Sequence, residues 1–166
     1  RTAYESAFDR GRTHVIQLDA DGQHDASDIP RFVDAAKAQT HALILGAPIF
    51  DETIPWVRLH GRKLSQFIVN WQTHSKDVAD PLCGFRCIPL APALDLLSQE
   101  QTGDRMDFDP ELIIRLVRNG TPVINIPTKV QYPEGGVSHF RMVEDNVLIA
   151  WAYLRLAMGR GGAPRE

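Results

Sequence analysis

The sequence has few of the residues that build metal–thiolate centres. Its 166 residues include only two cysteines, Cys83 and Cys87, which lie four positions apart. Because no second cysteine pair accompanies them, a zinc site would have to borrow distant histidines as ligands. We therefore expect two buried free thiols.

Long apolar runs and basic clusters are also missing. No stretch approaches the roughly 20 apolar residues that span a bilayer, and the N-terminus lacks the features of a signal peptide. These absences predict a cytoplasmic protein. The net charge is -3, and no run of Lys and Arg with interleaved aromatics matches a protein that follows a phosphate backbone. We expect no nucleic-acid partner.

The composition and the order of segments indicate one α/β domain. The chain is 43% hydrophobic and 23% charged, which is ordinary for a globular domain. Apolar residues recur with helical spacing in some segments and follow strand-like patterns in others. The patterns predict helices over 3–10, 27–36, 56–71, 89–97, 110–118 and 139–158, and strands over 13–18, 42–46, 83–88 and 122–130. The predicted domain covers 1–158, and 159–166 forms a flexible tail.

The most informative segment places Asp19, Asp21, Gln23 and Asp25 directly after the apolar run 15–18. We interpret that run as a buried parallel strand that delivers its acids to the carboxyl edge of the sheet, where open α/β folds bind ligands. Strand side chains alternate, so Asp19 and Asp21 would point to the same side. Such oxygen ligands suit Mg²⁺ or Mn²⁺ completed by substrate phosphates. The alternative is that Asp and Gly merely end a strand in a turn.

A second segment is 80–86, in which Pro and Gly shape a tight turn. Arg86 offers a planar donor fork that suits a phosphate or a carboxylate. Asp80 is placed to orient an arginine or a metal-bound water. The alternative is a structural turn in which Arg86 pairs with an acid of the protein.

A third segment is 107–112. On local grounds Asp109 caps a helix, Pro110 takes its first position and Glu111 lies in its first turn. This gives a complete structural explanation of the segment. The functional alternative makes Asp109 or Glu111 a general base or an acceptor-binding carboxylate at the same sheet edge.

A fourth segment, 132–141, is a loop with two glycines before a predicted helix. Its donors Ser138, His139 and Arg141 are able to clamp a diphosphate. The alternative is an ordinary loop in which Ser138 caps the helix.

In this order and at these spacings, the four segments resemble family 2 glycosyltransferases of the GT-A fold, in the branch around dolichyl- and polyprenyl-phosphate sugar synthases. The resemblance covers about 15–141. It implies a GT-A (Rossmann-like) mixed sheet flanked by helices. It also implies a metal-dependent, inverting transfer of a sugar from a nucleotide-diphosphate donor to a lipid-linked or polyprenyl-phosphate acceptor. The sequence of 45–62 and of 132–140 is also similar to glycosyltransferases encoded in bacterial aryl-polyene pigment clusters.

The resemblance also implies roles for individual residues. Asp19, Asp21 and Gln23 would hold Mg²⁺ or Mn²⁺ and the donor diphosphate. The candidates for phosphate contacts are Arg86, Ser138, His139 and Arg141. A phosphate acceptor would need no general base, whereas a hydroxyl acceptor would take one from Asp80, Asp109 or Glu111.

The sequence departs from the family pattern in two places. Family members usually carry Gly-Ser-Arg after the second strand, where this chain has 46–48 as Gly-Ala-Pro, so Arg62 or Arg141 would have to substitute. The family also begins with a strand and two further βα units that we do not find here. We therefore expect a sheet that lacks these first units and an exposed edge that promotes a homodimer.

Two other classes of protein remain open. One is a truncated, non-catalytic glycosyltransferase-like domain. The other is a metal-dependent nucleotidyltransferase or phosphohydrolase, although the chain shows neither a Gly-rich phosphate loop nor an obvious nucleophile arrangement.

Two amphipathic helices raise the possibility of a membrane contact. The apolar stripe from Phe140 to Leu154, and the helix from Trp56 to Trp71 with its three cations, suit the inner face of a membrane near a lipid acceptor. The alternative, which is commoner among soluble domains, is that both apolar stripes face the core.

Overall fold

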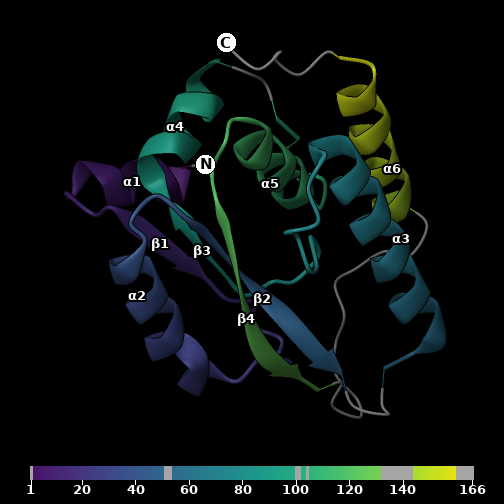
Figure 1. Cartoon of the computed structure of the whole chain (residues 1–166), viewed down its shortest axis with the longest axis horizontal. Coiled ribbons are helices and arrows are strands. Elements are labelled where there is room, and N and C mark those ends of the chain that lie inside the picture. The colour runs from purple at the N-terminus through teal and green to yellow at the C-terminus, as the bar shows by residue number, and fades with distance from the viewer. Residues whose placement is uncertain (1, 51–53, 100–101, 104, 132–143, 160–166) are drawn as a thin grey trace.

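The apolar runs of the sequence form one four-stranded mixed sheet, shown in Figure 1. This computed structural model describes residues 2–50, 54–99, 102–103, 105–131 and 144–159. Its strands are β1 (His14–Gln17), β2 (Leu43–Phe50), β3 (Arg86–Pro89) and β4 (Val123–Val130), in the order β1-β3-β2-β4. Its helices are α1 (Thr2–Asp9), the short 3₁₀ helix η1 (Ala26–Asp28), α2 (Ile29–Ala38), α3 (Trp56–Thr73), α4 (Leu90–Gln99), α5 (Phe108–Arg118) and α6 (Glu144–Ala157). The expected mixed α/β sheet flanked by helices is confirmed.

Strand direction decides which chain segments meet at each edge of the sheet. β2 and β4 pair in parallel from Leu43↔Val123 to Phe50↔Val130. β3 is antiparallel to both β1 and β2, so β1, β2 and β4 all run in one direction. The carboxyl ends of these three strands therefore lie at the same edge, and β3 begins there.

The expectation of a buried parallel strand before Asp19 is wrong in two respects. β1 is half-buried along its whole length, and it pairs with antiparallel β3. Among the described residues its other edge has no strand partner. The run 15–18 is apolar because it packs against helices on both faces of the sheet. No parallel neighbouring strand is needed to explain the pattern.

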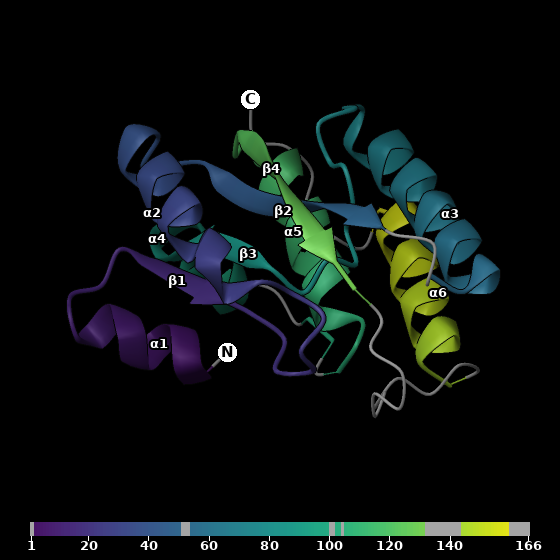
Figure 2. The same ribbon diagram turned by 90° about the horizontal axis from the view of Figure 1, so that it is seen from below.

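Side-chain alternation along the strands divides the core into two parts. Leu43, Leu45 and Ile88 pack with α3, α4, α5 and α6, whereas Ile44 and Cys87 pack with α2. Phe32 of α2 stacks on Phe85 with ring centroids 3.9 Å apart. Helices therefore cover both faces of the sheet, and Figure 2 shows α2 well separated from α3 and α6.

The predicted cap of one helix differs from the structure, and the cap residue of another makes no cap hydrogen bond. α5 begins at Phe108 with Asp107 in the cap position, so Asp109 lies inside the first turn and its carboxylate is used elsewhere. Asp28 occupies the cap position of α2 but makes no cap hydrogen bond; it accepts instead from Thr128 and pairs with Arg31. These carboxylates form tertiary contacts that local sequence rules do not include.

The thiols are as the sequence predicts, because Cys83 and Cys87 are both free and buried. Burial raises the pKa of each to about 11. Relative to the ordinary pKa of 9.0, this lowers the thiolate fraction near neutral pH by roughly a hundredfold.

We therefore expect the native protein to react with a thiol reagent such as iodoacetamide at pH 8 at least about a hundredfold more slowly than the urea-unfolded chain. Stopped aliquots analysed by mass spectrometry give both rates. Rapid modification of either cysteine in the native state would contradict the buried position.

Candidate functional site

The segment after β1 spans the carboxyl edge of the sheet. β1 and β4 are the outer strands, yet His24 forms a β-bridge with Val130 and the Gln131 N–H donates to the Gln23 carbonyl at 3.1 Å. The loop 18–25 must therefore cross from the end of β1 to the end of β4. It carries Asp19 and Asp21, both exposed, and it brings Asp19 against Gly84, just before β3.

Local contacts position the two aspartates. Asp21 Oδ1 accepts the Gln23 N–H at 3.0 Å, a turn that Gly22 completes with a φ of 75°. The Asp19 carboxylate lies against the Gly84 backbone so closely that a Cβ at position 84 would overlap it. Asp19 can therefore lie at this edge because residue 84, just before β3, has no side chain.

The donor set at this edge fits a hard divalent ion. The described residues contain no group of three or more His, Cys, Asp or Glu side chains able to hold a metal by themselves. Two exposed carboxylates and the Gln23 amide supply oxygen ligands, and Mg²⁺ typically takes one or two carboxylates and completes its shell with water and phosphate oxygens. The chemistry therefore suits an ion shared with a phosphate ligand. The assignment of Asp19, Asp21 and Gln23 as metal ligands stays a prediction.

His24 lies close enough to several charged side chains of this edge for them to influence its pKa. Its pKa is lowered, mainly by burial and also by Arg62 and Arg86, while Asp19 and Asp21 oppose the shift. Its ring also contacts Phe85 edge-on, with centroids 5.8 Å apart. Two residues predicted to bind metal, one predicted to bind phosphate, and Arg62 therefore all lie within electrostatic reach of His24.

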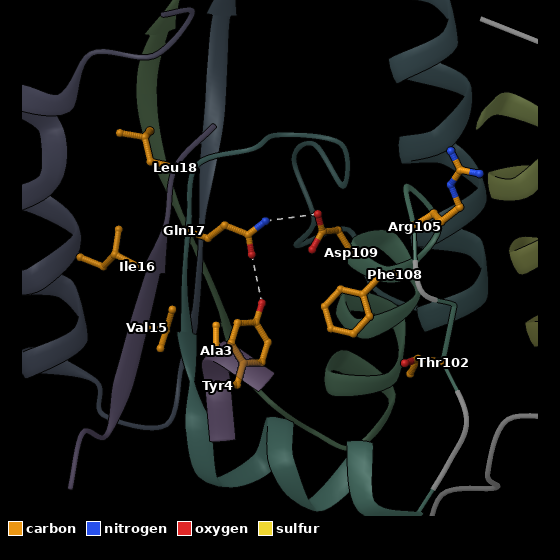
Figure 3. Close-up of a pocket in the computed structure, with 10 residues that line it drawn as sticks. All are labelled: Ala3, Tyr4, Val15, Ile16, Gln17, Leu18, Thr102, Arg105, Phe108 and Asp109. Carbon is orange, nitrogen blue, oxygen red and sulfur yellow. Dashed lines mark hydrogen bonds between the residues drawn. The ribbon is translucent and has the colours of Figure 1, made fainter. Parts of the chain in front are cut away.

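Asp109 belongs to a chain of polar contacts that runs beside β1 (Figure 3). The Tyr4 hydroxyl donates to Gln17 Oε1 at 3.0 Å, and Gln17 Nε2 donates to Asp109 Oδ2 at 3.3 Å. Arg86 Nη1 lies 3.1 Å from Asp109 Oδ1. Burial, with a further contribution from Asp109, raises the pKa of Tyr4 to about 12. Asp109 is therefore joined to Arg86, one of the predicted phosphate-binding residues.

These contacts line a cavity of about 860 Å³. It lies between α1, β1 and the start of α5, and its walls also include Thr102, Arg105 and Phe108. Sequence reasoning missed Tyr4, Gln17 and His24. Gln17 had a visible signal, a polar side chain within an apolar strand, and His24 lies inside the acidic segment itself, but nothing in the sequence singled out Tyr4.

Asp80 faces a second cavity, of about 230 Å³, between β2 and α3. Its Oδ2 lies 2.8 Å from Arg62 Nη1, and its Oδ1 accepts the Leu82 N–H at 2.8 Å. Arg62 also lies over the Phe50 ring, 5.3 Å from the centroid. The remaining walls are Ala47, Pro48, Leu59, Lys63, Gln66 and Ala79. Arg62 is thus held at the place where Ala47 and Pro48 replace the family's usual serine and arginine.

Glu111 is fully buried and faces α6. Its Oε1 pairs with Arg115 at 2.6 Å, and its Oε2 accepts from Arg155 at 2.5 Å and from the Gly103 N–H at 3.0 Å. Burial raises the pKa of Glu111, and the Gly103 N–H and Arg155 oppose that shift. Both oxygens are engaged in holding α5, α6 and residue 103 together, so these contacts are structural. A catalytic role for Glu111 stays a prediction.

Three predicted phosphate contacts, Ser138, His139 and Arg141, lie outside the described residues. Most of the predicted tail, 160–166, does so as well.

Comparison with known proteins gives similarity at low identity. No family model matches the chain. The chain is 28% identical over 149 residues to a polyprenol monophosphomannose synthase of Mycolicibacterium smegmatis, covering 82% of this chain and 54% of that protein. It is 23% identical over 163 residues to a UDP-N-acetylglucosamine–dolichyl-phosphate N-acetylglucosaminyltransferase of Methanococcus voltae, covering 96% of this chain and 64% of that protein.

An uncharacterized protein of Methanocaldococcus jannaschii is 24% identical over 131 residues, which is 75% of this chain and 52% of that protein. The chain thus spans between about half and just under two thirds of the length of these relatives. The two relatives with descriptive names both transfer sugars to polyprenyl or dolichyl phosphates, and they support the resemblance to that group of glycosyltransferases.

Proposed function

We propose that this protein is a glycosyltransferase that moves a sugar from a nucleotide-diphosphate donor to a polyprenyl-phosphate acceptor. The names of two relatives support the class of reaction. The loop with Asp19 and Asp21, which crosses the edge where three strands end, supports the position of the donor. The family 2 assignment, the inverting mechanism and the narrower likeness to aryl-polyene enzymes belong to the same proposal.

The donor's diphosphate would lie beside Asp19, Asp21 and Gln23, which would share Mg²⁺ or Mn²⁺ with it. When bound, such an ion neutralises the charge that builds on the departing nucleoside diphosphate. Arg86 and the two aspartates all lie close enough to His24 to influence its pKa. The Arg86 guanidinium is oriented by Asp109 and adds positive charge at this edge.

The observation that favours a phosphate acceptor is that every candidate general base is paired with an arginine. Asp80 is paired with Arg62, Asp109 with Arg86, and Glu111 with Arg115 and Arg155. Each of these carboxylates is engaged with a guanidinium, so it would have to give up an ion pair to take a proton from a hydroxyl. A phosphate oxygen is already ionised and needs no base. It attacks the anomeric carbon as the bond to the donor diphosphate breaks, which inverts the configuration there.

The cavity beside α3 suits the acceptor phosphate. Arg62 and Lys63 bring two cations to its wall, and Gln66 adds a donor. The Arg62–Asp80 pair keeps the guanidinium fixed, which lowers the entropy lost on binding an anion. Lys63, on the exposed side of the helix, is then free to adjust to the ligand.

A second copy of the chain is a further proposed partner. Among the described residues, the outer edge of β1 has no strand beside it, and an unpaired edge is a template for pairing. Sedimentation equilibrium over a range of concentrations reports this dimer directly.

The donor site is tested by calorimetric titration of UDP- and GDP-sugars with Mn²⁺. We expect binding that requires Mn²⁺ and that Asp21→Ala weakens by about tenfold or more, because it removes one of the two carboxylate ligands. The matched control is Asp34→Ala, at an exposed position of α2. This variant should bind the donor as the unmodified protein does. Absence of binding by a folded chain would favour a non-catalytic domain, and binding without metal would reject the role of Asp21.

The contact between Gly84 and Asp19 gives a separate prediction. Gly84→Ala should displace the Asp19 carboxylate and weaken Mn²⁺-dependent donor binding by about tenfold or more, since it removes one of two carboxylate ligands. Gly61→Ala is the control, because a Cβ there meets nothing within 4 Å, and alanine stabilises a helix interior by up to about 1 kcal/mol. Equal donor affinity in both variants would show that Asp19 is not a ligand.

The acceptor is tested by comparing polyprenyl phosphate with the corresponding alcohol, in the presence of whichever donor binds. We expect transfer to the phosphate alone. Lys63→Gln should raise the KM for the phosphate acceptor by roughly tenfold through loss of a charged hydrogen bond, with kcat little changed, while the Arg62–Asp80 pair stays intact. Lys37→Gln on α2 is the matched control. Transfer to the alcohol, or an unchanged KM in Lys63→Gln, would refute the proposed acceptor site.

A further inference from the structure

Helix α3 directs most of its large apolar side chains outward and buries two polar ones. Its buried positions are Ser65, Val69 and Gln72. Its large apolar side chains are instead mostly exposed: Trp56 71%, Val57 57%, Leu64 60%, Phe67 69% and Trp71 62%. A surface helix of a soluble domain normally shows the opposite arrangement. The commoner interpretation of the sequence, in which this stripe faces the core, is therefore wrong.

Helix α6 continues the same surface. It lies beside α3 in both Figure 1 and Figure 2 and contacts it. It buries Ile149, Ala152 and Leu156. Its exposed apolar side chains are Val147, Trp151 and Leu154, and the exposed Met158 follows directly after it. We call these four residues and the five exposed ones of α3 the apolar face. All three tryptophans of the chain belong to it.

Buried polar contacts fix the rotation of both helices. Gln72 Nε2 donates to the Tyr153 carbonyl at 2.9 Å. Arg118 of α5 donates to the Gln72 carbonyl, the Gln72 amide oxygen and the Leu156 carbonyl at 3.0 to 3.1 Å. Turning either helix to bury its apolar stripe would break these bonds and leave polar groups unsatisfied. These hydrogen bonds therefore keep the apolar face turned outward.

Charge around the apolar face has one sign along α3. The segment 54–76 contains Arg58, Arg62, Lys63 and Lys76 and no Asp or Glu, in a chain whose net charge is -3. An anionic surface would therefore be attracted to this side of the protein in spite of the overall charge. Helices with aromatic and aliphatic side chains on one face and cations at its border bind membrane interfaces.

We propose that the apolar face lies in the headgroup region of an anionic lipid bilayer, with α3 and α6 parallel to the membrane plane. Tryptophan suits this depth because its ring is apolar and its N–H stays near water. No helix in the described part of the chain is both long and apolar enough to cross the bilayer, so the contact is with one surface of the membrane.

The bilayer explains the surface better than a protein partner does. None of the nine residues lines either cavity of the candidate site, whereas protein hot spots typically lie in well-packed pockets. The cavity with Arg62 and Lys63 opens on the flank of α3 instead. The inference deepens the proposed function, because a lipid acceptor would bring its phosphate to that flank at headgroup depth.

The test uses vesicles of phosphatidylcholine, with and without phosphatidylglycerol, and neither donor nor acceptor. All tryptophan emission comes from the apolar face, so binding should shift the emission to shorter wavelength and carry the protein with floating vesicles, more strongly when phosphatidylglycerol is present. Phe67→Glu should weaken partitioning by about tenfold or more, as expected when an apolar contact is replaced by a charge. Phe8→Glu on α1, also an exposed phenylalanine, should leave it unchanged.

Each outcome decides the proposal. A folded protein that does not bind anionic vesicles, or equal binding by the two variants, overturns it. An emission shift that appears with rising protein concentration in the absence of lipid, together with a dimer in sedimentation equilibrium, assigns the face to a second copy instead. Because no sugar transfer is measured, vesicle binding without transfer would refute only the proposed reaction.

Discussion

The buried carboxylate of Glu111 is the constraint on which the arrangement of helices depends. A charge with no exposure to solvent must be paired, and removing one partner of a buried pair typically costs about 3–5 kcal/mol. Glu111 satisfies this requirement with Arg115 on its own helix, Arg155 on α6 and the Gly103 N–H. One turn beyond Arg115, Arg118 holds the C-terminal ends of α3 and α6. Polar contacts therefore tie α3, α5 and α6 together beside their apolar core, and the exposed apolar side chains of the outer two helices face outward.

The same helix connects this seam to the sheet edge. Asp109 lies two residues before Glu111 and holds Arg86 at the start of β3. Because β3 runs against its neighbours, its first residues lie beside the last residues of the strands that carry the acidic loop. Gly84 thereby meets Asp19, although more than 60 residues separate them in the chain. An all-parallel sheet would have placed the start of β3 at the opposite edge.

Local patterns predicted most elements, since apolar spacing depends only on neighbouring residues. The alternation of Leu43, Ile44 and Leu45 between two core clusters is the period-two pattern of a strand buried on both faces. The order of strands was not predictable, because it depends on pairings between distant segments. The partners of Asp109 and Glu111 were hidden for the same reason: helix-capping rules use local sequence, whereas these carboxylates bind Arg86 and Arg155. On α3 the sequence showed an apolar side, but period alone does not say whether that side meets the protein or another apolar medium.

The ion pairs and the outward apolar face are independent features, and both favour a lipid-linked phosphate as the acceptor. If Asp80, Asp109 and Glu111 are all committed to arginines, the proposed nucleophile has to carry its own charge, as a phosphate does. A phosphate on a long apolar chain lies at the headgroup level of a bilayer, the depth at which tryptophans and flanking cations place α3. Arg62 takes part in both arrangements, since it pairs with Asp80 and lines the cavity on the flank of that helix. The position of one arginine would then align a charged headgroup in the membrane with the end of the strands where the sugar donor is proposed to bind.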